Sequence, residues 1–185
     1  MNTDSAREVE QILQLFREHG DSQYGFEAVS QLEHALQTAT LALEADAGEA
    51  LVAAALLHDI GHLLHDLPDD APDQGIDDCH EEMGGDWLAG HFCNEVVEAV
   101  RLHVPAKRYL CAIDSSYRDE LSDPSRQSLA LQGGPMNPGE LAAFEAHPFH
   151  RQSVQLRRWD DLAKDPDAIT PALGFFRPHL ASALK

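Results

Sequence analysis

The sequence predicts an all-α protein, and two observations support this. Apolar side chains recur at helical spacing over residues 6–19, 32–43 and 51–64. No segment shows the alternation of apolar and polar residues that is typical of a half-buried strand. The chain has 185 residues, of which 43% are hydrophobic. It is therefore long enough for one domain, residues 1–185, and too short for two ordinary ones.

The first two predicted helices have clear boundary signals. Gly20 ends the first helix, because glycine is common just after a helix. Ser30, followed three residues later by Glu33, forms a capping box that begins the second helix. The pair Ala47-Gly48 then separates the second helix from the third.

The third predicted helix, residues 51–64, is so rich in Ala, Leu and Val that we expect it to be central in the fold. It carries His58-Asp59 near its end and His62 four residues after His58. Residues four apart lie on the same face of a helix. We therefore expect His58 and His62 to project from one face.

The second half of the chain contains further helix signals. Pro105 should end the helix that includes His103, and Asn137-Pro138 is a good helix start, with Asn as the cap. An acidic loop is expected over residues 67–75. The remaining helices are expected at about residues 80–88, at 92–103, from Asp123 onward, and at 149–163.

The composition excludes several classes of partner. The chain has 32 acidic and 13 basic residues, a formal net charge of -19, which would repel nucleic acid and anionic membrane surfaces. No stretch approaches the roughly 18 apolar residues of a membrane span, and the polar N-terminus lacks a signal core. The three cysteines have neither metal spacing nor an even count for disulfides, so we expect a cytoplasmic protein.

Histidine is unusually frequent, with 11 residues, and this makes metal binding the first hypothesis. In the pair His58-Asp59, the imidazole and the carboxylate can bind one divalent cation, and the second carboxylate oxygen can bridge to another. Nitrogen and oxygen ligands without thiolate suit iron or manganese better than structural zinc. Taken singly, each candidate could instead be a helix cap or a core histidine. The other candidates, on separate predicted helices or helix ends, are His34, His80, His103 and Asp160.

These six candidate ligands, in their order along the chain, resemble those of the HD-domain superfamily in its six-ligand dinuclear form. The segment Leu57-His58-Asp59-Ile60-Gly61-His62 is shared by many phosphohydrolases of that superfamily. More specifically, the chain resembles the mixed-valent di-iron oxygenases that cleave carbon–phosphorus bonds, relatives of inositol oxygenase. The residues that carry this closer resemblance are Tyr24, Glu27, Lys107, Ser125, Gln132-Gly-Gly-Pro and Arg157 to Lys164. It implies an HD-domain helical bundle.

The resemblance also implies a set of metal ligands. His34, His58, Asp59 and Asp160 would hold one iron, and Asp59 would bridge to a second iron held by His80 and His103. Asp160 is preferred to Asp161 because the related oxygenases have an aromatic residue before the ligand and a lysine four positions after it. Trp159 and Lys164 fit that register, and Asp161 is the alternative.

The activity that the resemblance implies is cleavage of a 1-hydroxy-2-(ammonio or trimethylammonio)ethylphosphonate, with O2 as co-substrate. The products would be phosphate and glycine or glycine betaine. Tyr24 would occupy an iron position that the substrate later takes, and Glu27 would pair with the substrate's cationic group. These two residues and His62 are the predicted catalytic residues. His62, Lys107, Ser125 and Arg157 would contact the phosphonate.

The residues themselves agree with part of this assignment. A chain this acidic needs local cations to hold a doubly charged anion, and Lys107 and Arg157 could supply them, although both could instead form ordinary salt bridges. Two other functions stay open. One is a metal-dependent phosphohydrolase acting on a small phosphate ester or nucleotide, and the other is a non-catalytic binding module. Tyr24 with Glu27 favours the oxygenase, because a hydrolase has no evident use for that pair.

Overall fold

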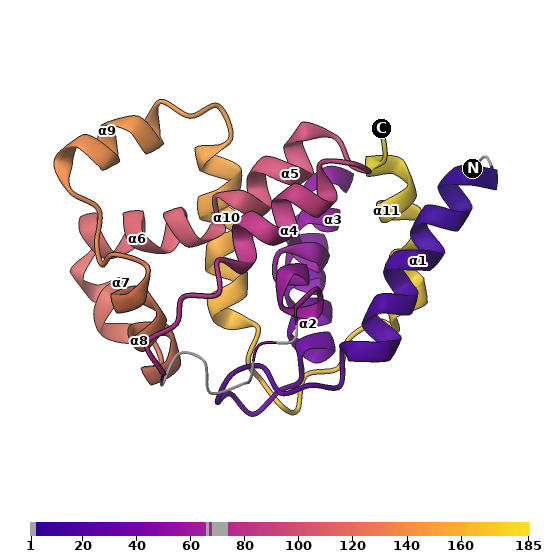
Figure 1. Cartoon of the computed structure of the whole chain (residues 1–185), viewed down its shortest axis with the longest axis horizontal. Helices are drawn as coiled ribbons and strands as arrows, with labels where there is room; N and C mark the ends of the chain where they lie inside the picture. The colour runs from indigo at the N-terminus through magenta and orange to yellow at the C-terminus, as the bar shows by residue number, and fades with distance from the viewer. Residues whose placement is uncertain (1–2, 66, 68–73) are drawn as a thin grey trace.

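The computed structural model describes residues 3–65, 67 and 74–185. In this part of the chain there is no strand, only two isolated bridges, so the all-α prediction is confirmed. The helices, shown in Figure 1, are α1 (Thr3–His19), α2 (Gln31–Glu44), α3 (Glu49–Leu57), η1 (Ile60–Leu63), α4 (His80–Leu88), α5 (Asn94–Arg101), α6 (His103–Ile113), α7 (Ser115–Glu120), α8 (Asp123–Leu131), α9 (Pro138–Glu145), α10 (His150–Leu162), η3 (Leu173–Phe176) and α11 (Arg177–Ala183).

Helix α3 is the centre of the core. Every residue from Val52 to Leu57 is buried, and the helix packs against α2, α5, α10 and α11. Because α3 is surrounded on all sides, its sequence is apolar all round rather than on one stripe. This confirms the central position expected for it. The capping box at Ser30 and the helix start at Asn137-Pro138 are also confirmed. Asn137 forms a capping box as well, with Glu140.

Helix α10 lies between two groups of helices. It packs against α2, α3 and α5, and also against α6. In Figure 1, α6, α7, α8 and α9 lie at one end of the molecule, while α1 and α11 lie at the other. Side chains of α10 are thus placed between the apolar core and the second group of helices. Among the described residues, no helix is both long and apolar enough to cross a membrane.

The prediction of one continuous helix over residues 51–64 is wrong. Helix α3 ends at Leu57, and the short 3-10 helix η1 follows. The physical reason is local: the Nδ1–H of His58 donates to the carbonyl oxygen of Ala55, 2.9 Å away, which in a continuing helix would accept from Asp59. His58 and His62 therefore do not share a face.

Pro105 does not end the helix that contains His103. Helix α5 ends at Arg101, and α6 begins at His103 with Pro105 in its first turn. Proline is tolerated there, because the first N–H groups of a helix have no partner within the helix. Helices α7 and α11 were not predicted. Most of the acidic loop expected at 67–75 lies outside the described residues, which include only 67, 74 and 75 of it.

Gly61 allows η1 to lie directly against the start of α4. A Cβ added at Gly61 would be 2.0 Å from the backbone oxygen of His80, so any side chain there forces the backbone to move. We expect Gly61→Ala to lower the free energy of unfolding by about 1–3 kcal/mol or more. Urea denaturation measures this. Gly174→Ala is the matched control, because a Cβ there meets nothing within 4 Å. Equal stability of the two variants would contradict the close packing.

Candidate metal centre

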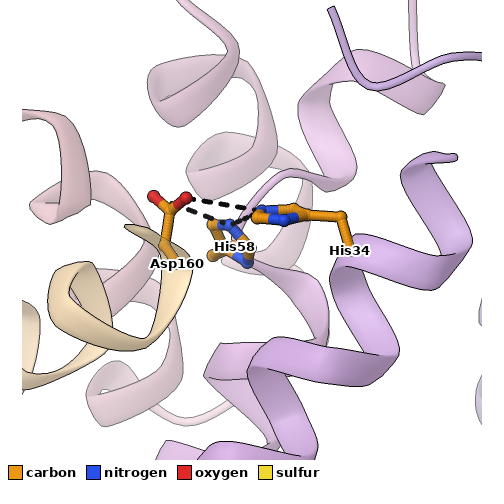
Figure 2. Close-up of side chains that lie close together, drawn as sticks. All are labelled: His34, His58 and Asp160. Carbon is orange, nitrogen blue, oxygen red and sulfur yellow. Dashed lines mark hydrogen bonds and ion pairs between the residues drawn. The ribbon is translucent and has the colours of Figure 1, made fainter. Parts of the chain in front are cut away.

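The first group of candidate ligands is His34, His58 and Asp160, which come from α2, the end of α3 and α10 and are all buried. The Nε2 atoms of His34 and His58 are 3.0 Å apart. Asp160 places Oδ1 3.4 Å from His34 Nε2 and Oδ2 3.8 Å from His58 Nε2. Figure 2 shows the three side chains pointing toward one another.

The second group is Asp59, His80 and His103, also buried. His80 is the first residue of α4 and His103 the first residue of α6. Their Nε2 atoms are 3.1 Å apart. Each of these atoms lies 3.3 Å from Oδ1 of Asp59. The second group therefore has the same composition as the first, two imidazoles and one carboxylate.

Asp59 joins the two groups. Its Oδ1 faces the second pair of imidazoles, whereas its Oδ2 lies 3.4 Å from His34 Nε2 and 3.2 Å from His58 Nε2. One carboxylate thus presents one oxygen to each group. This is the arrangement that a carboxylate bridge between two cations requires.

The four imidazoles are held in one tautomer. Because a carbonyl oxygen only accepts, the Nδ1 atoms of His34, His58 and His103 must carry hydrogen: they donate to Ala163, Ala55 and Val100 at 2.8, 2.9 and 2.6 Å. His80 donates its Nδ1–H to the carboxylate of Asp78 at 2.8 Å. In the neutral rings every Nε2 therefore has a free lone pair directed at the centre, as metal-binding histidines have.

The charges of the centre favour a cation. Burial opposes ionisation of Asp59 and Asp160, yet His58 beside Asp59 and Arg157 beside Asp160 hold both pKa values well below the usual range. Burial also lowers the pKa of His34, but Asp160 and Asp59 outweigh it and raise that pKa to about 9. The raised pKa means that His34 would hold a proton when no cation is present. Two buried carboxylates, together with paired Nε2 atoms about 3 Å apart, fit cations that would take the place of that proton.

Asp160 and Asp161 have different surroundings. Asp160 is 1% exposed and belongs to the first group, whereas Asp161 is 19% exposed and pairs with Arg157 and the Tyr117 hydroxyl. Arg157 joins the two carboxylates, because its Nη1 donates to Oδ2 of Asp160 at 2.6 Å. The geometry therefore favours Asp160 over Asp161 as the candidate ligand.

A cavity of about 170 Å³ lies beside the centre. Four of the candidate ligands border it, namely Asp59, His80, His103 and Asp160. All six residues expected to contact the substrate also line it: Tyr24, Glu27, His62, Lys107, Ser125 and Arg157. The fold thus brings the two sets of predicted residues to one place.

Tyr24 lies against the first group. Its ring stacks on that of His34, with centroids 3.8 Å apart, and its hydroxyl donates to Oδ1 of Asp160 at 3.3 Å. Burial, and then the charges of Asp160 and Asp59, raise the pKa of Tyr24 well above its ordinary value. Without a cation the phenol therefore stays protonated beside the centre.

Lys107 and Arg157 are both buried at the cavity wall. Lys107 donates to the hydroxyl of Ser128 at 2.9 Å. Burial, and then the positive charge of Arg157, lower the pKa of Lys107 to about 7. An anion in the cavity would favour the charged lysine. Arg157 already donates to Asp160 and Asp161, but each of its terminal nitrogens carries a second N–H.

Glu27 already has hydrogen-bond partners within the protein. Its Oε1 accepts from Lys164 at 2.8 Å and from the hydroxyl of Ser122 at 2.7 Å. The Lys164 ammonium also lies 3.2 Å from the hydroxyl of Ser122 and 3.1 Å from that of Ser125, so its three donors have three acceptors. Sequence reasoning used Lys164 only to fix a register. No signal in the sequence links Lys164 to Glu27, 137 residues away.

His62 lies beside the second group. Its ring stacks on that of His80, with centroids 4.1 Å apart, and its Nδ1 is 3.0 Å from Oδ2 of Asp78. Burial, and then His80, lower the pKa of His62. Asp78 was missed by the sequence reasoning, although its position two residues before His80 could have suggested it.

Comparison with known proteins agrees with this geometry. The HD domain matches residues 32–142, a range that contains five of the six candidate ligands. The sixth ligand, Asp160, lies outside this range, as do Tyr24 and Glu27. The hydroxymethylphosphonate dioxygenase of Gimesia maris is 45% identical over 178 residues, 96% of this chain and 88% of that protein. The [1-hydroxy-2-(trimethylamino)ethyl]phosphonate dioxygenase (glycine-betaine-forming) of Leisingera caerulea is 41% identical over 170 residues, 92% and 87% of the two chains.

These similarities extend well beyond the HD domain itself and include the region of Asp160. Both named relatives are phosphonate dioxygenases. The chain belongs to the HD-domain family and is a homologue of its phosphonate dioxygenases.

Proposed function

We propose that this protein is an O2-dependent di-iron oxygenase that cleaves the carbon–phosphorus bond of a small 1-hydroxyphosphonate in organophosphonate catabolism. The products would be phosphate and a carboxylate. The observation that carries the proposal is the position of Asp59 between two pairs of buried imidazoles, at the wall of a cavity that also contains buried cationic side chains. The names of the two relatives support the reaction class.

His34, His58, Asp59 and Asp160 would hold one iron, and Asp59, His80 and His103 the other. The Fe(II)/Fe(III) pair would supply O2 activation and would bind the substrate's hydroxyl and phosphonate oxygens. The chain orients the imidazoles through their Nδ1–H bonds and keeps the ligands away from bulk water, since all six are buried.

Lys107, Arg157, His62 and Ser125 would hold the phosphonate. All four line the same cavity as the candidate ligands. Among the described residues, Lys107 donates to the hydroxyl of Ser128 and forms no ion pair with a carboxylate, so its charge can bind an anion. Burial strengthens such a pairing, because there is little water to compete with it.

Glu27 and Tyr24 would contact the other end of the substrate. Lys164 now neutralises Glu27, so a substrate with a cationic group would have to share or displace that ammonium. Tyr24 would give up its place beside Asp160 when the substrate enters. One relative is named for hydroxymethylphosphonate, which has no group beyond C1, and the other for a substrate with a trimethylamino group. Both substrates, like the ammonio analogue, are candidates here.

Phosphate release from a 1-hydroxyphosphonate, measured with and without O2, tests the proposal. The iron-loaded protein should release phosphate from hydroxymethylphosphonate, or from its 2-ammonio- or 2-trimethylammonioethyl analogue, only when O2 is present. A phosphate monoester is the control substrate. Release of phosphate from the ester without O2 would instead identify a phosphohydrolase, and no release from any of these compounds would rule out both activities for them.

The role of Glu27 can be tested by Glu27→Gln. If Glu27 contacts a cationic substrate, this change should raise KM about 10-fold or more for the ammonio substrate, because a charged hydrogen bond is lost. The iron content should stay the same. Hydroxymethylphosphonate, which has no cation, is the internal control. An equal effect on both substrates would show that Glu27 acts only by holding Lys164.

A further inference from the structure

We propose that Asp78 is a positioning residue that orients two imidazoles at once, His80 toward the metal centre and His62 toward the substrate. The His62 part rests on the function proposed above, and the His80 part requires only that the centre binds metal. Asp78 precedes α4 and lines the cavity without belonging to either group of candidate ligands.

The first oxygen of Asp78 serves His80. Oδ1 accepts the Nδ1–H of His80 at 2.8 Å and lies 3.3 Å from the backbone nitrogen of the same residue. The other three candidate histidine ligands donate to backbone carbonyls. His80 is therefore the candidate ligand whose tautomer is fixed by a full negative charge, which also makes its Nε2 more basic.

The second oxygen of Asp78 serves His62. Oδ2 lies 3.0 Å from Nδ1 of His62, and the His62 ring stacks on His80 with an interplanar angle of 22°. The carboxylate and the stacked ring fix both the direction and the plane of the imidazole. Since Nδ1 faces Asp78, the nitrogen that remains for a ligand in the cavity is Nε2.

The backbone conformation of Cys79, the residue between Asp78 and His80, supports these contacts. Cys79 has φ 50° and ψ 38°, a left-handed conformation that residues other than Gly, Asn and Asp rarely adopt. The conformation lets the carboxylate of Asp78 fold back onto the first turn of α4, where it meets the backbone N–H of His80. Such strain persists where the surrounding contacts outweigh its cost.

A third cation among His62, His65 and Asp78 is the competing interpretation, because their ligand atoms also lie close together. The tautomer of His65 argues against it. The backbone N–H of Leu67 donates to Nδ1 of His65, so the neutral ring carries its hydrogen on Nε2. That Nε2 lies 3.6 Å from Oδ2 of Asp78 and offers a hydrogen rather than a lone pair.

The test compares Asp78→Ala with Asp77→Ala. Asp77 is the exposed neighbour, so both variants remove one negative charge from the same wall of the cavity. By Coulomb's law alone, each loss should strengthen binding of an anion. We expect Asp77→Ala to do so slightly. Asp78→Ala should instead weaken iron binding about 10–100-fold and, at saturating iron, weaken phosphonate binding about 10-fold.

Asp78→Asn provides the second variant and should fold even if Asp78→Ala does not. It keeps one acceptor oxygen, which can serve only one imidazole, so its defect should be smaller than that of Asp78→Ala. Iron affinity and phosphonate affinity are measured by titration without turnover, so the result does not depend on catalysis. If Asp78→Asn binds both iron and the phosphonate like the unchanged protein, the proposal is wrong. Three metal ions in the unchanged protein and two in Asp78→Asn would establish the third cation instead.

Discussion

Asp59→Ala is expected to reduce oxygen-dependent phosphate release by more than about 100-fold, because loss of even an outer partner of a metal ligand typically costs about 10–100-fold. Asp59 presents one carboxylate oxygen to each pair of imidazoles. Without it, neither pair retains its bridging anion, and four buried imidazoles face one another with less negative charge to hold a cation. The measurement is iron content together with phosphate release.

Two further variants complete that comparison. His58→Ala should reduce activity similarly, since it removes a ligand of the first group. Asp119→Ala removes an exposed carboxylate and should leave iron content and activity unchanged. Full activity and two bound iron ions in Asp59→Ala would contradict the dinuclear proposal.

Asp160→Ala and Asp161→Ala should separate a metal ligand from its neighbour. Asp160 is buried against His34 and His58, and its loss should remove iron from the first group and reduce activity by more than about 100-fold. Asp161 pairs with Arg157 and accepts from the Tyr117 hydroxyl, so its loss should retain iron and have a smaller effect, mainly on phosphonate binding.

Iron content of the two variants decides between the carboxylates. The opposite pattern, with iron lost in Asp161→Ala and retained in Asp160→Ala, would show that the register of this segment in solution differs from the one described here. Circular dichroism controls for folding, because Asp160 and Arg157 form a buried ion pair whose disruption costs stability.

The helices were largely predictable from the sequence because helix periodicity and caps are local. Ser30 with Glu33 and Asn137 with Pro138 marked helix starts correctly. Besides the missed helices α7 and α11, two boundaries were wrong, where a side chain or the position of a proline changed the outcome. His58 ends α3 by bonding the carbonyl of Ala55, and Pro105 lies in the first turn of α6 rather than after a helix.

The candidate site was predictable only in part. His58-Asp59 is visible as a pair, but its meeting with Asp160, about a hundred positions later, is a property of the packing of α10 on α2 and α3. The resemblance to known oxygenases, and not the pattern of residues in this chain, suggested that Asp160 lies beside His58 and Asp59. The partners that position these residues were not suggested at all, because Lys164 and Asp78 are ordinary charged residues until the fold places them beside Glu27 and His62.

Paramagnetic resonance of the iron-loaded protein, incubated with a 1-hydroxyphosphonate, tests the central claim most directly. Two iron ions joined by Asp59 should give the signal of a coupled Fe(II)/Fe(III) pair, and Asp59→Ala should lose that signal. A spectrum of isolated ferric ions in the unchanged protein, or a coupled signal that persists in Asp59→Ala, would contradict the account.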